Sequence, residues 1–227
     1  MEVNRLHTIS ISRDIKQVVP HFKIGVIDYS NIEVIPSPQM IKGRLQLFQE
    51  SIYFDLENTN INDIPSIKEW REIFKATGKD PNRYRHSAEA LYRRIKKQNY
   101  LLPINSSIDL NNFFSLQFGV PIGIYDTANL SGDIIIRIGK ENEQYTGLNG
   151  RSNSLEHLII NADELGPFGS PFVDSNRAPV TSSTKDAVQI VYLQASTPME
   201  KATKMVESLM NMFIQIHGGE GNFAIID

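Results

Sequence analysis

Four runs rich in Ile and Val lie between residues 120 and 193, and each is about the length of a single strand. They cover residues 120–125, 133–138, 158–162 and 187–193. β-Branched side chains favour strands because they pack well on a pleated, half-buried surface. Two earlier segments, 8–11 and 22–29, have the same character. We therefore predict that a mixed β-sheet forms the centre of the fold.

Segments with apolar residues three to four positions apart flank these strands, and this is the spacing of an amphipathic helix. They cover residues 40–54, 66–76, 87–97, 107–118 and 197–217. Ser87, Ser107 and Thr197 are the predicted N-caps, and the Gly-rich sequence after His217 is predicted to be a frayed tail. Because helices cluster in the first half and at the end, the sequence predicts a single α+β domain in which helices flank the sheet.

Composition excludes several classes of site. The chain of 227 residues has no Cys, which excludes disulfides, thiolate catalysis and Cys-ligated zinc. Its five His residues are scattered, without the His-Glu-x-x-His spacing of a metal site, so neither a metal nor another cofactor is expected. Charged residues interrupt the segment from Met1 to Ile15, and no window approaches the roughly 20 apolar residues of a membrane span. We expect a soluble, cytoplasmic protein without membrane contacts.

Positive charge is concentrated in one stretch of an otherwise acidic chain. Residues 68–97 contain ten Lys and Arg against four acidic residues, a net charge of +6, whereas the whole chain carries −3 and the remainder therefore −9. The overall charge is unlike that of an obligate duplex-DNA binder, so DNA is not an expected partner. The side chains predicted to contact an RNA backbone are those of Arg83, Arg85, His86, Arg93, Arg94, Lys96 and Lys97. Tyr84 and Tyr92 are available to stack on unpaired bases.

The same charges also fit a purely structural interpretation, in which they are the solvated faces of two amphipathic helices. Glu89 lies four residues before Arg93, a spacing at which an ion pair supports a helix. The charge pattern by itself leaves both interpretations open.

A set of motifs extends from residue 83 to residue 193. The stretch from Arg85 to Arg94 begins with Arg-His-Ser-Ala-Glu-Ala-Leu at the start of a predicted helix. A second group with characteristic order and spacing consists of Asn112, Gly119, Pro121, Ile122, Asp126, Gly132 and Arg137. A third consists of Ile159, Ile160 and Asp163, followed by Val180 and Thr184. Together these residues resemble the B3/B4 domain of the phenylalanyl-tRNA synthetase β subunit, including the segment with its Gln-Pro-Leu-His-Ala-Phe-Asp motif.

The resemblance implies an α/β domain that accepts the aminoacylated 3′ end of a tRNA, with tRNA and an aminoacyl-tRNA synthetase as expected partners. In bacterial synthetases this domain hydrolyses mischarged tyrosine from phenylalanine tRNA. The sequence has no class II synthetase core, so aminoacylation by this chain alone is not expected. On this basis residues 61–227 are predicted to be a B3/B4-like tRNA-binding domain, and residues 1–60 an N-terminal extension packed on it.

The substrate pocket is predicted to depart from that of the synthetase. Its expected lining residues are Asn112, Gly123, Tyr125, Asp126, Asp163, Asp174, Thr181 and Thr184. Gly123 stands where the synthetase motif has His, Gln189 lies where the synthetase has a pocket Glu, and residues 169–173 replace its Gly-Val-Met-Gly-Gly loop. The catalytic residues therefore stay unassigned. Asp and Thr in such loops also commonly brace turns, which is the structural alternative.

Three functions remain, in order of preference. The first is a hydrolase that clears a wrong amino acid from tRNA in trans, and the second is a non-catalytic tRNA-binding module, which the missing His and Glu favour. The third is an amino-acid sensor that uses the pocket of the fold and ignores RNA.

Overall fold

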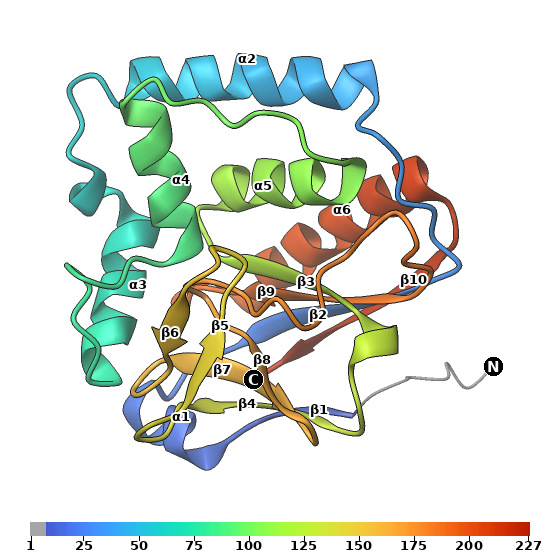
Figure 1. The fold of residues 1–227 in the computed structure, drawn as a ribbon. Coiled ribbons are helices and arrows are strands. Elements are labelled where there is room, and N and C mark those ends of the chain that lie inside the picture. The colour runs from blue at the N-terminus through green and yellow to red at the C-terminus, as the bar shows by residue number, and fades with distance from the viewer. Residues whose placement is uncertain (1–7) are drawn as a thin grey trace.

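The computed structural model describes residues 8–227, and most of its helices and strands lie close to the predicted segments (Figure 1). The strands are β1 (Ile9–Ile11), β2 (Ile24–Ser30), β3 (Ile122–Asp126), β4 (Ile134–Ile138), β5 (Gln144–Thr146), β6 (Ser152–Ser154), β7 (Ile159–Asp163), β8 (Gly166–Gly169), β9 (Ala187–Tyr192) and β10 (Glu220–Ile226). The helices are α1 (Arg13–Val18), α2 (Gln39–Asp55), α3 (Pro65–Ala76), α4 (Ser87–Lys96), α5 (Ser106–Phe118) and α6 (Met199–His217), with short 3-10 turns η1 (Ile61–Asp63) and η2 (Thr127–Asn129). Residues 1–7, which include His7 and the start of the predicted extension, lie outside the described residues.

The strands of the described residues divide into two four-stranded sheets and a small hairpin. The inner sheet has the order β10-β2-β9-β3 and is antiparallel. The outer sheet has the order β1-β4-β7-β8, with β1 parallel to β4 and the other pairs antiparallel. Strands β5 and β6 form the hairpin. The predicted α+β domain with helices beside mixed β-structure is confirmed, and its strands are shared between two sheets.

The inner sheet lies between the outer sheet and a layer formed by α5 and α6 (Figure 1). On one face, the ring of Tyr125 on β3 lies edge-on to Phe168 on β8, with ring centroids 4.8 Å apart. On the other face, Tyr29 on β2 stacks on Phe213 of α6 at 4.1 Å. Both faces of the inner sheet are therefore covered, which explains why every residue of β9 is buried.

Helices α2, α3, α4 and α5 pack around a second hydrophobic cluster beside the sheets. Its buried members include Leu45 and Ile52 of α2, Ile67 of α3, Ile95 of α4 and Leu116 of α5. Helix α2 forms the outermost layer on this side of the molecule (Figure 1).

Part of the predicted N-terminal extension lies inside the main fold. Strand β2 pairs with β10 along one edge and with β9 along the other, so it is an internal strand of the inner sheet. Helix α2 contacts α4 and α5. The division of the chain at residue 60 stays a prediction, and these contacts make residues 24–55 integral to the same packed unit.

Three helix starts differ from the predicted caps. The N-cap of α4 is His86, whose Nδ1 accepts a hydrogen bond from the Glu89 amide at 3.3 Å, and the Ser87 amide donates to the Pro171 carbonyl. Asn105 caps α5 through a 2.9 Å bond from the Ile108 amide. Helix α6 has Pro198 at its N-cap and no side-chain capping bond, so the predictions of Ser87, Ser107 and Thr197 as caps were wrong.

The predicted frayed tail was also wrong, because residues 220–226 form β10 and pair along their whole length with β2. The chain reverses at Gly218 and Gly219, both with positive φ. A Cβ atom at Gly219 would lie 2.2 Å from the Ser30 carbonyl oxygen, so this tight turn requires glycine.

Candidate functional site

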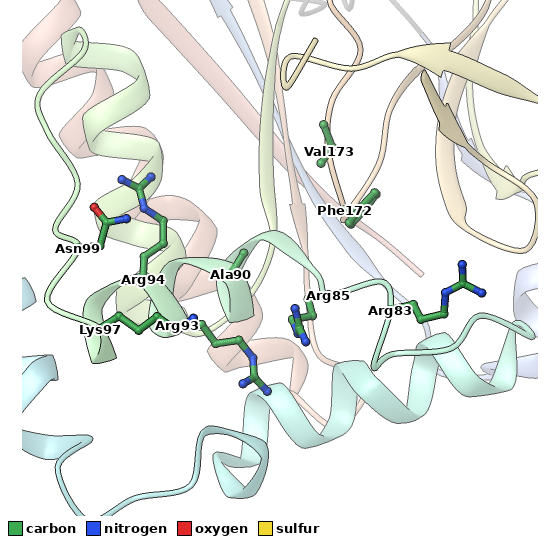
Figure 2. A pocket seen from close by; sticks show the side chains of 9 residues that line it. All are labelled: Arg83, Arg85, Ala90, Arg93, Arg94, Lys97, Asn99, Phe172 and Val173. Carbon is green, nitrogen blue, oxygen red and sulfur yellow. The ribbon is translucent and has the colours of Figure 1, made fainter. Parts of the chain in front are cut away.

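A basic pocket lies where the turn before α4, α4 itself and the loop after β8 meet (Figure 2). Its volume is about 400 Å³, and its lining residues are Arg83, Arg85, Ala90, Arg93, Arg94, Lys97, Asn99, Phe172 and Val173. A neighbouring pocket of about 390 Å³ shares Arg85, Arg93 and Lys97 and adds Ile61 and Lys96. The structure thus brings together all the predicted RNA-contacting side chains except that of His86. We call Arg83, Arg85, Arg93, Arg94, Lys96 and Lys97 the basic surface.

A buried carboxylate organises part of this surface. Glu89 on α4 is fully buried, and its Oε1 lies 2.8 Å from Nε of Arg93, 3.1 Å from Nη1 of Arg71 and 3.8 Å from Nε of Arg85. Arg93 is further held by a 2.7 Å bond from Nη2 to Oδ1 of Asn62. The predicted Glu89–Arg93 pair is therefore confirmed. One carboxylate faces three guanidinium groups, so this cluster keeps a net positive charge.

Arg83, Arg94 and Lys97 are exposed cations without such a partner. Within residues 8–227, none of the three makes a side-chain hydrogen bond or ion pair. Lys96 is partly engaged, because its Nζ donates a 2.7 Å bond to the Thr59 carbonyl. Their charges are therefore uncompensated by the protein and available to an anionic ligand.

An aromatic side chain faces the cations across the basic pocket. Phe172 and Val173 lie on the loop after β8, opposite the arginines of the α4 region (Figure 2). The loop is held against α4 by the 2.8 Å bond from the Ser87 amide to the Pro171 carbonyl. The ring centroids of Phe172 and Tyr84 lie 5.4 Å apart, and the rings meet edge to face. Nζ of Lys79 lies 4.1 Å from the centroid of the Tyr84 ring. Phe172 was not among the predicted site residues, and only its place in the substituted loop marked it in the sequence.

His86 and Tyr92 do not belong to this surface, which corrects their predicted roles. His86 is fully buried against Trp70 and Phe74, and burial, followed by the nearby charge of Arg71, lowers its pKa to about 3. The imidazole is therefore neutral and cannot contact a phosphate. The Tyr92 hydroxyl donates a 2.7 Å bond to the Leu116 carbonyl, so Tyr92 braces α4 against α5.

A polar cluster lies between the two sheets, next to the loop that carries Phe172. The Tyr125 hydroxyl donates a 2.6 Å hydrogen bond to Oδ1 of Asp174 and accepts one of 3.0 Å from Nδ2 of Asn161. The Ser170 amide donates a 3.2 Å bond to the same Asp174 oxygen. Burial raises the pKa of Asp174 to about 6. The hydrogen bonds that Asp174 accepts from Tyr125 and from the Ser170 amide act in the opposite direction and lower this pKa. We call Tyr125, Asn161, Ser170 and Asp174 the inter-sheet cluster.

The other predicted pocket residues form separate groups that brace loops. Thr184 donates a 2.6 Å bond to Oδ2 of Asp126 and accepts one of 3.0 Å from the Thr181 amide. Asp163 accepts a 2.8 Å bond from Nη2 of Arg177 and bonds from the backbone amides of residues 131 and 165. Asn112 lies on α5 and bonds to none of these residues within the described chain. Of the eight residues, Tyr125 and Asp174 thus belong to the inter-sheet cluster, and Gly123 lies beside the Tyr125 hydroxyl.

Two structural features are absent from residues 8–227. No helix there is both long and apolar enough to cross a membrane. The same residues contain no group of three or more His, Asp or Glu side chains placed to share a metal ion.

Comparison with known proteins places this arrangement in a family. The sequence profile of the B3/4 domain matches residues 69–208, which is more than half of the chain. The chain belongs to the B3/4 domain family.

Relatives of this B3/4 protein include one of similar size and several much longer ones. It is 35% identical over 195 residues to the uncharacterized protein YhzB of Bacillus subtilis (strain 168), covering 86% of this chain and 87% of that protein. It is 38% identical over 68 residues to the phenylalanine–tRNA ligase beta subunit of Paramagnetospirillum magneticum, covering 30% of this chain but only 8% of that subunit. An N-terminal fragment of the phenylalanyl-tRNA synthetase beta subunit from Pyrococcus horikoshii superposes with a TM-score of 0.49 at 14% identity, covering 96% of this chain and 50% of that fragment.

The B3/4 match contains both the basic surface and the inter-sheet cluster. Within the B3/4 chain, the Tyr125 hydroxyl occupies the space beside Gly123 and Gly169. A Cβ atom at either glycine would lie 2.1 Å or 2.2 Å, respectively, from the Tyr125 oxygen. A side chain at position 123 and the hydroxyl on residue 125 would therefore compete for the same space.

Proposed function

We propose that this B3/4 protein binds the aminoacylated 3′ end of a tRNA on the basic surface and hydrolyses a mischarged aminoacyl ester in trans. The observation that carries the proposal is the pocket in which Arg83, Arg94 and Lys97, uncompensated by the protein, face the aromatic ring of Phe172. We further propose that it acts in the cytoplasm, beside the synthetase that produces its substrate.

Binding follows from the chemistry of a single-stranded RNA end. Lys and Arg side chains neutralise phosphates, and an aromatic ring stacks on an unpaired base regardless of its identity. The basic surface supplies the cations, and Phe172 supplies a ring at the same concavity. The negative charge of the rest of the protein would repel a long RNA duplex lying across it. We therefore expect contact with the single-stranded end of the RNA.

Hydrolysis requires a water that attacks the ester carbonyl, so that the ester C–O bond breaks and the tRNA hydroxyl recovers a proton. A carboxylate with a pKa near the working pH is a suitable general base. Asp174 has a pKa of about 6 and follows directly on Phe172 and Val173 in the pocket wall. We propose Asp174 as this base, reached when the side chains of Phe172 and Val173 move aside while Asp174 keeps its buried place beside Tyr125.

A second function, tRNA binding without hydrolysis, is favoured by the closed state of that cluster. Tyr125 both bonds to Asp174 and fills the space beside Gly123, where the resembling synthetase motif has His. In this alternative the protein holds charged tRNA, or presents it to a synthetase, and leaves the ester intact.

Titration of a charged tRNA at several salt concentrations tests tRNA binding, the step that both proposed functions share. We expect affinity to fall steeply with salt, because each neutralised phosphate releases counterions. The double variant Arg94→Glu/Lys97→Glu should lose at least about tenfold in affinity and show a shallower salt dependence. Lys201→Glu, an exposed lysine on α6 outside the basic surface, is the matched control. Equal affinities of the wild type and the double variant would refute the assignment of the site, and binding of free amino acids without RNA would favour the sensor.

A further inference from the structure

Helix α2 presents an apolar stripe to the solvent. Met40, Leu47 and Phe54 are 51%, 68% and 67% exposed and lie seven residues apart, which places them along one face of the helix. The opposite face packs on the main core through Ile41 and on the second hydrophobic cluster through Leu45 and Ile52. The packing of α2 within its own chain therefore does not bury this stripe.

Small residues separate the large ones on this face. Gly43 and Ser51 lie four residues before and four residues after Leu47. A Cβ atom at Gly43 would meet nothing within 4 Å, so the space above it is open. Large side chains alternating with small ones allow a second helix to approach closely and interdigitate.

Charge is distributed unequally between the two halves of α2. Its first half carries Lys42 and Arg44, and its second half carries Glu50 and Asp55. Arg44 and Asp55 are both exposed and stand eleven residues apart, about three helical turns, so they lie on the same flank of the stripe. Neither has an ion-pair partner within residues 8–227.

We propose that α2 pairs antiparallel with α2 of a second copy of this chain, about a twofold axis at Leu47. This arrangement places Leu47 against the partner's Leu47, Met40 against the partner's Phe54, and Gly43 against the partner's Ser51. The flank with Arg44 then faces the flank with the partner's Asp55, twice by symmetry. A parallel pairing would put the two Arg44 flanks on opposite sides of the contact, so only the antiparallel pairing brings Arg44 towards the partner's Asp55.

The segment before α5 lies on the packed side of α2, opposite the stripe. It is tied to α2 by a 2.6 Å bond from the Leu101 amide to Oε1 of Gln49, and it exposes Leu102 (77%) and Ile104 (69%). Helix α2 has 17 residues and is therefore about 25 Å long. A contact of this length belongs with the small protein interfaces, so we expect a reversible dimer. The dimer is independent of the proposed tRNA site.

Because the chain has no Cys, single introduced cysteines report the geometry without background. Under mild oxidation we expect Leu47→Cys to form a disulfide-linked dimer with itself. Phe54→Cys should form little dimer alone, but should cross-link readily when mixed with Met40→Cys. Leu165→Cys, at a position that is also 68% exposed but lies away from α2, is the matched control.

Sedimentation equilibrium of the full chain up to about 200 µM measures the affinity, since small interfaces commonly dissociate in the micromolar range. Leu47→Asp should weaken the dimer by at least about tenfold, because it sets two carboxylates against each other at the axis. Arg44→Glu should also weaken it, and the exchange Arg44→Glu/Asp55→Arg should restore it. A wild type that stays monomeric throughout, or Leu47→Cys that cross-links no faster than Leu165→Cys, would overturn the proposal.

Discussion

The hydroxyl of Tyr125 donates a 2.6 Å hydrogen bond to Oδ1 of Asp174, a carboxylate whose pKa burial raises to about 6. Tyr125 belongs to β3 of the inner sheet, whereas Asp174 lies on the loop that carries Phe172 into the basic pocket. This hydrogen bond therefore connects the loop that lines the proposed tRNA site to the inner sheet.

Replacing Tyr125 by Phe should separate the role of this bond from that of the ring. We expect a loss of about 1–2 kcal/mol in the free energy of unfolding, because a buried acceptor loses its donor. The pKa of Asp174 should rise further, since the bond favours the ionised carboxylate. Urea denaturation measures the first effect, and NMR titration of the carboxyl group the second. An unchanged Asp174 pKa in the variant would contradict the bond.

The raised pKa of Asp174 predicts a pH dependence of stability with a definite sign. The folded state holds this proton more tightly than the unfolded chain, whose Asp pKa is near 3.8. The stabilising contribution of the protonated group is complete below about pH 4 and is lost as the pH rises through about 6. The stability difference between the wild type and Asp174→Asn, measured by urea denaturation from pH 4 to pH 8, should follow this curve. A difference independent of pH would show that Asp174 titrates normally.

Glu89→Gln tests the carboxylate that organises the basic surface. The substitution removes the charge that holds Arg71, Arg85 and Arg93, and we expect it to cost about 2–3 kcal/mol of unfolding free energy. Glu72→Gln is the control, because Glu72 forms an exposed pair with Lys75 and should leave stability almost unchanged. Equal effects of the two variants in thermal unfolding would contradict a central role for Glu89.

Gly123→Ala tests the packing between residue 123 and the Tyr125 hydroxyl. The new Cβ atom would lie 2.1 Å from that oxygen, so we expect a loss of about 1–3 kcal/mol from overpacking. Gly123→Ala/Tyr125→Phe should lose less than the sum of the two single variants, because the second change removes the atom in closest contact. Strict additivity in a double-mutant cycle would mean that the two positions are not coupled.

Local patterns in the sequence predicted the elements well, because helical spacing and runs of β-branched residues depend on neighbouring positions. The basic surface followed for the same reason, since Arg93, Arg94 and Lys96 share one short helix. The return of β10 to pair with β2 joins segments almost two hundred residues apart, and no local pattern in the Gly-rich stretch indicated it.

The remaining errors at the site have similar physical causes. Phe172 reaches the basic pocket from a loop about eighty residues after α4, so only tertiary packing brings them together. His86 lies between two surface-directed neighbours in sequence, but as the helix cap its ring turns inward onto Trp70. Asp126 and Thr184 hydrogen-bond to each other, and Asp163 bonds to Arg177. These residues therefore brace loops, as the structural alternative states.

The most direct test of the account is a deacylation assay with correctly and incorrectly charged tRNAs at stoichiometric protein. We predict that the wild type shortens the ester half-life of at least one mischarged tRNA, and that Arg94→Glu/Lys97→Glu and Asp174→Asn both slow this reaction while Lys201→Glu does not. Unchanged half-lives for every charged tRNA, at protein concentrations that bind them fully, would contradict hydrolysis and leave the chain as a tRNA-binding module.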